Sequence, residues 1–594
     1  MSVSGKAFDS NLLKRIFRFT KPYRKLFYQS VGLTVVLALI SPLRPMITQY
    51  TIDNFVTTDN ENGLLVLTML MIFLLVIQSI IQYFHSWCTN LLGQEVIMDL
   101  RTQLFSRYMN FRLSYFDKTP VGTTVTRSVS DMETIADIFS EGLIIIIGDI
   151  LQLIVIITVM LCIDWKLALI SLSTIPLLLI ATNVFKNKIK SSFGEVRTQV
   201  AALNTFVQEH LTGMRIVQIF NREKEEYKRF DTINKEHRDA NIRSVWYYSI
   251  FFPVVEILSA ISIGLIVWYG ASGVIRDEVT FGSLVAFIMY INMLFRPIRE
   301  LADKFNTLQM GMVSSERIFK VMDEDQLTFP GGNFTPDRVK GKIEFKNVWF
   351  TYAAQDTENK EPNWILKGVS FVVNPGEIVA FVGSTGAGKT TIISLLNRFY
   401  EISKGAILID DIDIREYTTA SLRKQIAVVL QDVFLFSDSI YNNITLYNDS
   451  ILESEVKAAS EKVGASVFID KLPHTYHYQV QERGSVLSMG QRQMISFIRA
   501  YVYNPAILIL DEATSSVDSE TEELITKATT TLTAQRTSIV IAHRLATIQN
   551  ANRIIVLDHG EIKEQGNHQE LLAQNGLYKE LFEIQFKNLV VKTA

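Results

Sequence analysis

The chain has few cysteines and almost no net charge. Two cysteines, Cys88 and Cys162, occur in 594 residues, both among apolar residues and without a Cys/His cluster around them. Such isolated cysteines are typical of small core residues and argue against a disulfide framework or a metal site. The formal net charge of −3 gives no reason to expect a nucleic-acid partner. The basic N-terminal segment lacks a small-residue cleavage site, so we expect no removed signal peptide.

Apolar residues, by contrast, are abundant. They make up 48% of the chain, and the mean hydropathy of +0.19 is high for a soluble protein of this size. A helix needs about 20 apolar residues to cross a bilayer. Stretches such as LLVLTMLMIFLLVIQSII have no polar face, which argues against buried helices of a large soluble protein. Six runs meet the length requirement, at 26–50, 64–88, 141–163, 166–186, 248–274 and 281–300.

Lys and Arg are distributed unevenly around these runs. Seven precede the first run, the loop DNFVTTDNENG after it has none, and the loop after the fifth run has only Arg276. Because positive residues stay on the cytoplasmic side, we expect the N-terminus and the C-terminal half in the cytoplasm. The external loops are then too small to form a receptor domain.

Two long segments between the runs, 89–140 and 187–247, are rich in both charge signs. We expect them to be helices that continue the spans into the cytoplasm. Each reaches a turn-like patch, LSYFDKTPVG at 113–122 and GMRIVQ at 213–218. These patches are either ordinary solvated helix or contact points for the C-terminal domain.

The second half of the chain alternates short β-rich runs with helical stretches, which predicts an α/β domain with parallel strands. The stretch FPGGN at 329–333 is typical of a linker. The sequence therefore predicts a transmembrane domain at 1–325, a linker at 326–340 and a second domain at 341–594.

A phosphate-binding motif, G-x-x-x-x-G-K-[ST], lies in the second domain between a predicted strand at 377–382 and the helical stretch TIISLLNRF. The glycines let backbone N–H groups surround phosphates, and the helix dipole adds to the attraction. Lys389 can reach the β- and γ-phosphates, and the Thr390 hydroxyl can hold Mg²⁺. The expected phosphate site comprises Gly383, Ser384, Thr385, Gly386, Ala387, Gly388, Lys389, Thr390 and Thr391.

Two further apolar strands are predicted at 506–510 and 538–542. Asp511 and Glu512 follow the first, at the sheet edge where α/β proteins bind ligands. Asp511 suits the Mg²⁺ shell, and Glu512 is placed to orient or deprotonate an attacking water. His543 follows the second strand and could contact the γ-phosphate.

The order of these motifs is more specific than any one of them. The phosphate loop, Gln431, LSMGQRQ, ILILDEATSSVD and IAHRL follow one another in one chain behind six spans. The chain thereby resembles the ATP-binding-cassette superfamily, and within it the type IV half-transporter exporters, which include bacterial multidrug exporters and lipid flippases. LSYFDKTPVG, GMRIVQIFNRE and SSERIFKVMDE also resemble segments of that family. The resemblance implies an all-α six-helix transmembrane domain with long cytoplasmic helical extensions, fused to an α/β P-loop ATPase domain.

The resemblance also implies roles for single residues. Tyr352 matches the aromatic residue that stacks on adenine, although a strand tyrosine can instead pack in the core. Gln431 matches the glutamine that senses Mg²⁺ and the γ-phosphate, Glu512 the catalytic carboxylate and His543 the switch histidine. Further matches are the loop that crosses between paired cassettes, at 516–518, and a segment that couples the cassette to the internal helices, at 482–484. In the latter, Gln481 stands where glycine is common.

LSMGQ departs from the family's LSGGQ at Met489 but retains Ser488, Gly490 and Gln491. In this family the segment closes over ATP bound by a second cassette, so the chain needs a partner. If the turn requires a positive φ, methionine costs roughly 1–2 kcal/mol, a five- to thirty-fold weakening at ~1.4 kcal/mol per decade. The variant is either tolerated in a homodimer or belongs to a heterodimer with two unequal sites. An intact Glu512 beside the altered segment favours the heterodimer.

We therefore expect a half-size exporter of the plasma or bacterial inner membrane that uses ATP and Mg²⁺ to move a hydrophobic or amphipathic compound. One alternative is a lipid flippase. Another is an ATP-gated channel or regulatory protein, although the presence of Glu512 and His543 argues against a switch that does not hydrolyse ATP. Asp149 in the third run is either functional or solvated at the interface. The aromatic runs at 247–252 and 287–290 either line a cargo path or pack helices. The first run begins near residue 26, so we expect no peptidase domain before it.

Overall fold

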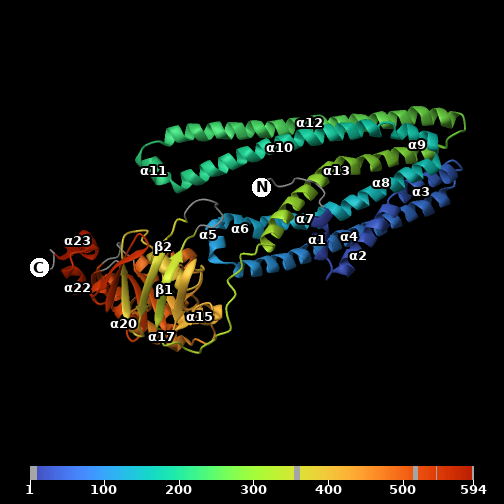
Figure 1. Cartoon of the computed structure of the whole chain (residues 1–594). Helices are drawn as coiled ribbons and strands as arrows, with labels where there is room; N and C mark the ends of the chain where they lie inside the picture. The colour runs from blue at the N-terminus through green and yellow to red at the C-terminus, as the bar shows by residue number, and fades with distance from the viewer. Residues whose placement is uncertain (1–9, 353–361, 513–518, 543–544, 591–594) are drawn as a thin grey trace. The chain divides into compact units, whose positions relative to one another are not determined.

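The computed structural model describes residues 10–352, 362–512, 519–542 and 545–590. The chain forms two compact units (Figure 1). The first, called the helical unit below, comprises Met1–Met109 and Pro120–Asp325. The second, called the α/β unit, comprises Asn110–Thr119 and Gln326–Ala594. A short piece from the first half of the sequence is thus part of the second unit.

The helical unit confirms the six predicted spans. Six helical stretches among the described residues are long and apolar enough to cross a membrane: Arg24–Val56, Glu61–Met109, Val121–Ile163, Trp165–Thr212, Glu223–Ile275 and Phe281–Glu300. Helices form here because hydrocarbon offers no partner for backbone N–H and C=O groups, which must then bond within their own segment. The helices of the unit are α1 (Ser10–Arg18), α2 (Arg24–Ile40), α3 (Leu43–Thr51), η1 (Ile52–Val56), α4 (Glu61–Met109), α6 (Val121–Ser128), α7 (Ser130–Asp137), η2 (Ile138–Gly142), α8 (Leu143–Ile163), α9 (Trp165–Leu172), α10 (Ile175–Thr212), α11 (Met214–Ile219), α12 (Glu223–Ile275) and α13 (Phe281–Met322).

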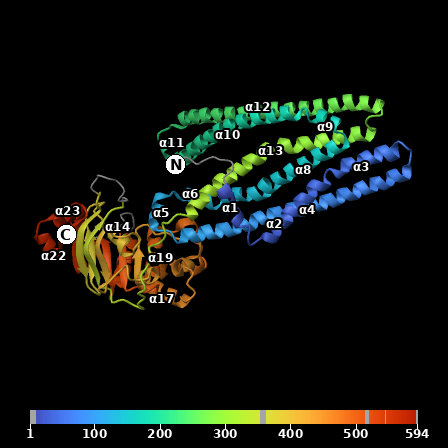
Figure 2. The ribbon, with the colours of Figure 1, turned by 45° about the vertical axis from the view of Figure 1, so that its right-hand side comes forward.

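Four of these helices are much longer than a bilayer is thick. α4, α10, α12 and α13 have 49, 38, 53 and 42 residues, whereas about 20 residues cross the hydrocarbon. The helices therefore continue past their apolar stretches, as the sequence predicted. α10 and α12 run side by side (Figures 1 and 2), joined by the stacked rings of Phe185 and Phe251 and by a hydrogen bond between Ser192 and Ser244.

The α/β unit contains two sheets. A four-stranded antiparallel sheet has the order β2-β1-β4-β5, and a six-stranded sheet has the order β10-β9-β3-β8-β7-β6. The strands are β1 (Ile343–Phe350), β2 (Leu366–Val373), β3 (Ile378–Val382), β4 (Lys404–Ile409), β5 (Ile412–Asp413), β6 (Ile426–Val429), β7 (Ile507–Glu512), β8 (Thr537–Ala542), β9 (Arg553–Asp558) and β10 (Glu561–Gly566).

Helices accompany both sheets of the α/β unit: α5 (Leu113–Lys118), α14 (Lys389–Leu396), α15 (Thr419–Gln425), α16 (Ile440–Thr445), α17 (Glu453–Val463), α18 (Ser466–Ile469), η3 (Thr475–His477), η4 (Glu482–Gly484), α19 (Met489–Val502), α20 (Ser519–Thr533), α21 (Leu545–Gln549), α22 (His568–Ala573) and α23 (Leu577–Val590). One core packs β1, β2 and β4 against β3, β7, β8 and α14. The strands β3, β8, β7 and β6 are parallel, which confirms the predicted parallel sheet.

The segment 110–119 lies against the start of the α/β unit's main stretch. Phe111 pairs with Leu327 in an antiparallel bridge, and the Thr328 N–H donates to the Asn110 carbonyl at 2.7 Å. The Arg112 guanidinium lies 3.8 Å from the centre of the Phe329 ring. Within LSYFDKTPVG itself, Asp117 accepts a hydrogen bond from the Tyr400 hydroxyl, which supports a contact point over a free solvated helix.

Asp149 forms an ion pair inside the helical unit. Its carboxylate accepts from the Lys304 ammonium at 2.6 Å, and Lys304 also donates to Glu300 at 3.1 Å. The side chains of Asp149 and Lys304 are only 16% and 18% exposed. Asp149 is thus held by a partner on α13, which neither interpretation from the sequence had included.

The two aromatic runs mostly pack helices together. Phe251, Phe287 and Tyr290 are buried in one apolar core of the helical unit, and the Tyr290 hydroxyl donates to the Pro42 carbonyl at 3.0 Å. Phe252 is exposed. The packing interpretation therefore accounts for most of these side chains.

Removing one partner of the buried ion pair is expected to lower the free energy of unfolding more than removing both partners. Lys304→Met leaves the Asp149 carboxylate unpaired, and we expect a loss of roughly 3 kcal/mol in unfolding free energy. Asp149→Asn combined with Lys304→Met is expected to recover most of it. Thermal unfolding of the purified chain in lipid nanodiscs measures both.

The exposed pair Lys235–Asp231 on α12 supplies the control. Lys235→Met is expected to change stability by less than about 0.5 kcal/mol. Equal destabilisation in Lys304→Met and in the double variant would show that the unpaired Asp149 carboxylate carries no penalty of its own.

Candidate nucleotide-binding site

The predicted phosphate and metal residues meet at one edge of the parallel sheet. Asp511 on β7 lies opposite Ile541 on β8, and Ile541 lies opposite Phe381 on β3. Parallel strands in register bring their carboxyl ends together. Gly383 after β3, Gln431 after β6 and Asp511 at the end of β7 therefore share this edge. His543, the side chain of Glu512 and the loop 516–518 lie outside what the structure describes.

Two glycines of the phosphate loop are required by their surroundings. Gly388 has φ +104°, a left-handed conformation that favours glycine. A Cβ on Gly383 would lie 2.1 Å from the Leu557 carbonyl oxygen. With glycine at both positions, the loop can turn tightly from β3 into α14. Ser384, Thr385 and Gly386 are exposed at the tip of the loop. The first N–H groups of α14 begin directly behind the loop.

Lys389 is buried under this loop. Its ammonium donates to the carbonyls of Gly383 and Ser384 at 2.7 and 2.9 Å. Burial lowers its pKa, and the nearby Asp511 carboxylate acts in the opposite direction. Burial likewise raises the pKa of Asp511, against the effect of Lys389. The site thus holds one cation and one carboxylate close to each other.

The oxygen donors at this edge fit Mg²⁺. The Thr390 hydroxyl and the Gln431 amide are exposed, and the Asp511 carboxylate shares their edge. Among the described residues no group of three or more His, Cys, Asp or Glu side chains could hold a metal. Mg²⁺ typically takes one or two protein oxygens together with substrate phosphates. The donor set is therefore suited to a metal that arrives with a nucleotide.

Tyr352 stands beside the first turn of α14. Its hydroxyl lies 3.2 Å from the hydroxyl of Thr391, which is buried. The Tyr352 ring packs edge-on against Phe350 and Tyr400, with ring centres 4.7 and 5.0 Å apart. Because Tyr352 is 45% exposed, it is not a core tyrosine, and part of its side chain is accessible to a ligand.

Tyr400 links this tyrosine to the segment 110–119, a connection that sequence reasoning missed. The Tyr400 hydroxyl donates to the Asp117 carboxylate. Burial, followed by this hydrogen bond, raises the pKa of Tyr400. Asp117 belongs to the patch LSYFDKTPVG, which the sequence indicated as a candidate contact point. The sequence gave no indication of Tyr400.

The segment LSMGQ begins helix α19. Ser488 caps the helix: its hydroxyl accepts from the Gln491 N–H at 3.2 Å, and the Gln491 side chain accepts from the Ser488 N–H at 2.9 Å. Met489 is the first helical residue and does not have a positive φ. The conformational cost considered from the sequence therefore does not arise. Any effect of Met489 must come from the bulk of its side chain.

That side chain is 41% exposed. It lines a cavity of about 300 Å³ together with Gln431, Phe434, Arg483 and Arg492. Met489 thus lines the same cavity as Gln431, the glutamine that follows β6.

Gln481, by contrast, has a strained backbone. Its φ of +54° and ψ of −173° fall in a region used almost only by glycine. This conformation gives a physical reason for the glycine that is common there in the resembling family.

Comparisons with known proteins agree with this architecture. Residues 27–298 match the model of the ABC transporter transmembrane region, and residues 366–515 match the model of the ABC transporter ATP-binding family. The chain is 38% identical to the ABC transporter ATP-binding protein YknV of Bacillus subtilis, over 98% of this chain and 96% of that protein.

Two other relatives have names that state a cargo. An ATP-dependent lipid A-core flippase of Syntrophus aciditrophicus is 33% identical over 97% of this chain and 95% of its own length. YgaD of Bacillus subtilis, to which multidrug export is provisionally ascribed, is 35% identical over 97% of this chain and all of its own length. The chain therefore belongs to the ABC transporters, as an integral membrane protein that binds ATP and couples its hydrolysis to export.

Proposed function

We propose that this chain is one half of an exporter in the plasma or bacterial inner membrane. It moves a hydrophobic or amphipathic compound outward by alternating access, with its N-terminus and ATPase domain in the cytoplasm. The observation that carries the proposal is the sheet edge with Lys389 and Asp511, fused to six spans. The names of two relatives support the two cargo classes, drug-like compounds and lipids. A lipid flippase with the same ATPase is therefore the second candidate.

The domain boundaries and residue roles follow the family pattern. Residues 1–325 form the transmembrane domain, 326–340 the linker and 341–594 the ATPase domain. Tyr352 stacks on adenine, Lys389 and the loop N–H groups hold the phosphates, and Mg²⁺ supplies charge neutralisation. The metal-binding oxygens are those of Thr390, Gln431 and Asp511. Glu512 activates the attacking water, and His543 contacts the γ-phosphate.

The start of α19 is the part that serves a partner's ATP. Ser488 already satisfies the N–H groups of Gln491 and Arg492 through its hydroxyl and its carbonyl. The N–H groups of Met489 and Gly490 are then the ones available at this helix N-terminus, where an anion is favoured. The partner is a second half-transporter, and the bulk of Met489 favours a heterodimer over a homodimer.

The segment 110–119 is suited to carry movement between the units. Asp117 bonds Tyr400, and the Tyr400 ring packs on Tyr352. A change at Tyr352 can thus reach Asp117 on α5 through the Tyr400 side chain. This chain of contacts supports coupling between ATP binding and the spans.

The first test is ATP hydrolysis and transport by the purified chain in proteoliposomes. Glu512→Gln removes the group that accepts a proton from water, so we expect turnover to fall at least ~100-fold while ATP binding persists. Uptake of a membrane-soluble dye and movement of a fluorescent phospholipid are measured together. The compound whose movement is lost in Glu512→Gln identifies the cargo class. ATP turnover that survives the substitution would contradict the catalytic role assigned to Glu512.

Met489→Gly tests the effect of side-chain bulk. If the bulk of Met489 obstructs the opposite ATP, the variant alone should hydrolyse ATP more than about twofold faster than the natural chain. Met489→Leu keeps the bulk and is the matched control. Rates of all three chains within a factor of two would remove the argument for unequal sites.

Tyr400→Phe tests the coupling contact. The ring packing on Tyr352 remains, so the ATP affinity should be unchanged, whereas the stimulation of turnover by a transported compound should fall about three- to tenfold with the lost hydrogen bond. Tyr447→Phe is the control, since Tyr447 makes a similar bond to Asp438 on the surface. Undiminished stimulation in Tyr400→Phe would rule out this route.

A further inference from the structure

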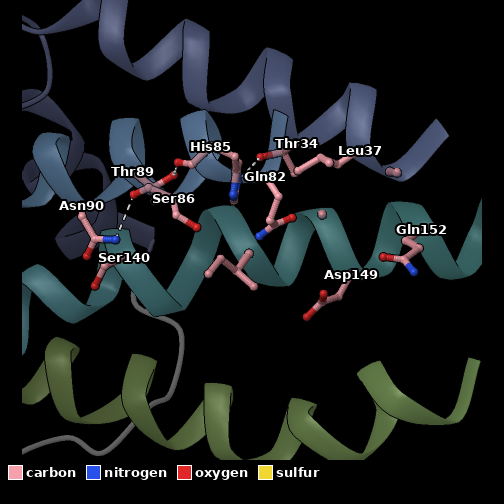
Figure 3. A pocket seen from close by; sticks show the side chains of 13 residues that line it. Thr34, Leu37, Gln82, His85, Ser86, Thr89, Asn90, Ser140, Asp149 and Gln152 are labelled. Carbon is pink, nitrogen blue, oxygen red and sulfur yellow. Dashed lines mark hydrogen bonds between the residues drawn. The ribbon is translucent and has the colours of Figure 1, made fainter. Parts of the chain in front are cut away.

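The helical unit contains three histidines, His85, His210 and His237, which differ in what their ring nitrogens contact. Nε2 of His85 lies 2.9 Å from the Thr34 hydroxyl oxygen (Figure 3), and Nε2 of His237 lies 3.1 Å from the Asn241 amide nitrogen. A neutral ring satisfies either contact, because a hydroxyl can accept from an N–H and an amide can donate to a lone pair. His210 is different, since both of its ring nitrogens lie against oxygens that accept.

The contacts of His210 require a proton on each ring nitrogen. Nδ1 lies 2.8 Å from the Phe206 carbonyl oxygen, which can only accept, and Nε2 lies 2.8 Å from a carboxylate oxygen of Glu226. The Arg229 guanidinium donates to both oxygens of that carboxylate at 3.1 and 3.0 Å, which stabilises its ionised form. Glu226 therefore accepts as well. The charged imidazolium is the form of His210 that makes both bonds.

The groups around the ring favour the same charged form. The hydrogen bond to Glu226, followed by the bond to the Phe206 carbonyl, raises the pKa of His210 above its ordinary value, against partial burial and the Arg229 charge. Arg215, the charged residue of α11, forms no hydrogen bond or ion pair with His210 among the described residues. The side chains of His210 and Glu226 are each 21% exposed, so the ring can exchange its proton with water.

This ion pair closes the base of the turn between α10 and α12. His210 lies in the last turn of α10 and Glu226 in the first turn of α12, and α11 connects the two helices (Figure 1). The apolar side chains of α11 and of the residue after it are mostly exposed: Ile216, Ile219 and Phe220. Because these side chains pack little, the conformation of α11 depends on how α10 and α12 are joined behind it.

Loss of the proton breaks one of the two bonds. One ring nitrogen then keeps a lone pair, which faces either the Phe206 carbonyl or the Glu226 carboxylate. The stabilisation from the pair is fully present below ~6.5, the ordinary pKa of histidine. It is lost as the pH rises through the raised pKa of His210. His210 lies well beyond the predicted span 166–186, so in the proposed orientation the relevant pH is that of the cytoplasm.

We propose that His210 is a pH-sensitive switch for the α11 turn: the imidazolium ties α10 to α12, and the neutral ring releases them. The turn carries the patch GMRIVQ at 213–218, the second candidate contact point for the ATPase domain. A looser turn is expected to transmit less between the spans and ATP turnover. The switch is a property of the helical unit, whereas its effect on turnover rests on the proposed function.

Hydrogen exchange of the purified chain in nanodiscs without nucleotide tests the switch. Backbone N–H groups of the turn are hydrogen-bonded, among them those of Ile216, Val217 and Arg222. Their protection factors are measured between about pH 6 and about pH 8.5, after correction for the pH dependence of intrinsic exchange. We expect protection across 211–222 to fall about two- to fivefold over this range, the effect of a partly exposed ion pair.

Two variants of His210 separate charge from structure. His210→Gln keeps an N–H donor near Glu226 but has no titrating charge, so we expect low protection at every pH. His210→Lys keeps a positive charge throughout the range, so we expect protection to stay near the low-pH value of the natural chain. His237→Gln is the matched control on α12. The His237 ring accepts a bond from Asn241, so this variant should retain the pH dependence.

Protection that does not change with pH in the natural chain would overturn the proposal. So would the same pH dependence in His210→Gln as in the natural chain. Low protection in His210→Lys would overturn it as well, because the shape of the ring rather than its charge would then hold the turn.

The effect on coupling is measured separately, as the stimulation of ATP turnover by a transported compound in proteoliposomes over the same pH range. We expect stimulation to decline with rising pH in the natural chain and to stay constant in His210→Lys. Equal decline in both chains would contradict the effect on coupling, because another group would then titrate. Absent ATP-dependent transport at every pH would instead count against the export function, so the two failures are distinguishable.

Discussion

A peptide N–H or C=O in hydrocarbon has no water to bond, and this constraint determines the first half of the molecule. Every long apolar run must form a helix that satisfies its own backbone. The same rule applies to side chains, and it explains the pairing of Asp149 with Lys304. His85 Nδ1 is one of several side-chain atoms that are buried without a hydrogen bond in the described part of the chain.

In the second half, burial is used to prepare charges for a ligand. Lys389 lies under its loop against two carbonyls, and Asp511 stands at the end of a buried strand. Burial alone disfavours both charged forms, and each partly compensates the other. In the proposed function, phosphate and a divalent metal bring the complementary charges, so nucleotide binding would relieve the cost of desolvation.

The altered segment LSMGQ illustrates how local geometry changes the meaning of a substitution. In a left-handed turn, methionine would strain the backbone. As the first residue of α19, behind a capping serine, it is unstrained and still presents an N–H. The proposed difference between two ATP sites is therefore steric. Gln481 shows the reverse: an ordinary residue type occupies a backbone conformation that favours glycine.

The sequence by itself determined the six spans, the parallel sheet and the motif residues at its edge, because periodicity, length and local motifs are properties of neighbouring residues. It also indicated the patch at 113–122 and the unusual residues Met489 and Asp149. Only the tertiary structure paired Asp149 with Lys304 and placed Tyr400 between Asp117 and Tyr352. These contacts join residues from separate helices and strands. Their distances depend on how the elements pack, which no local pattern in the sequence specifies.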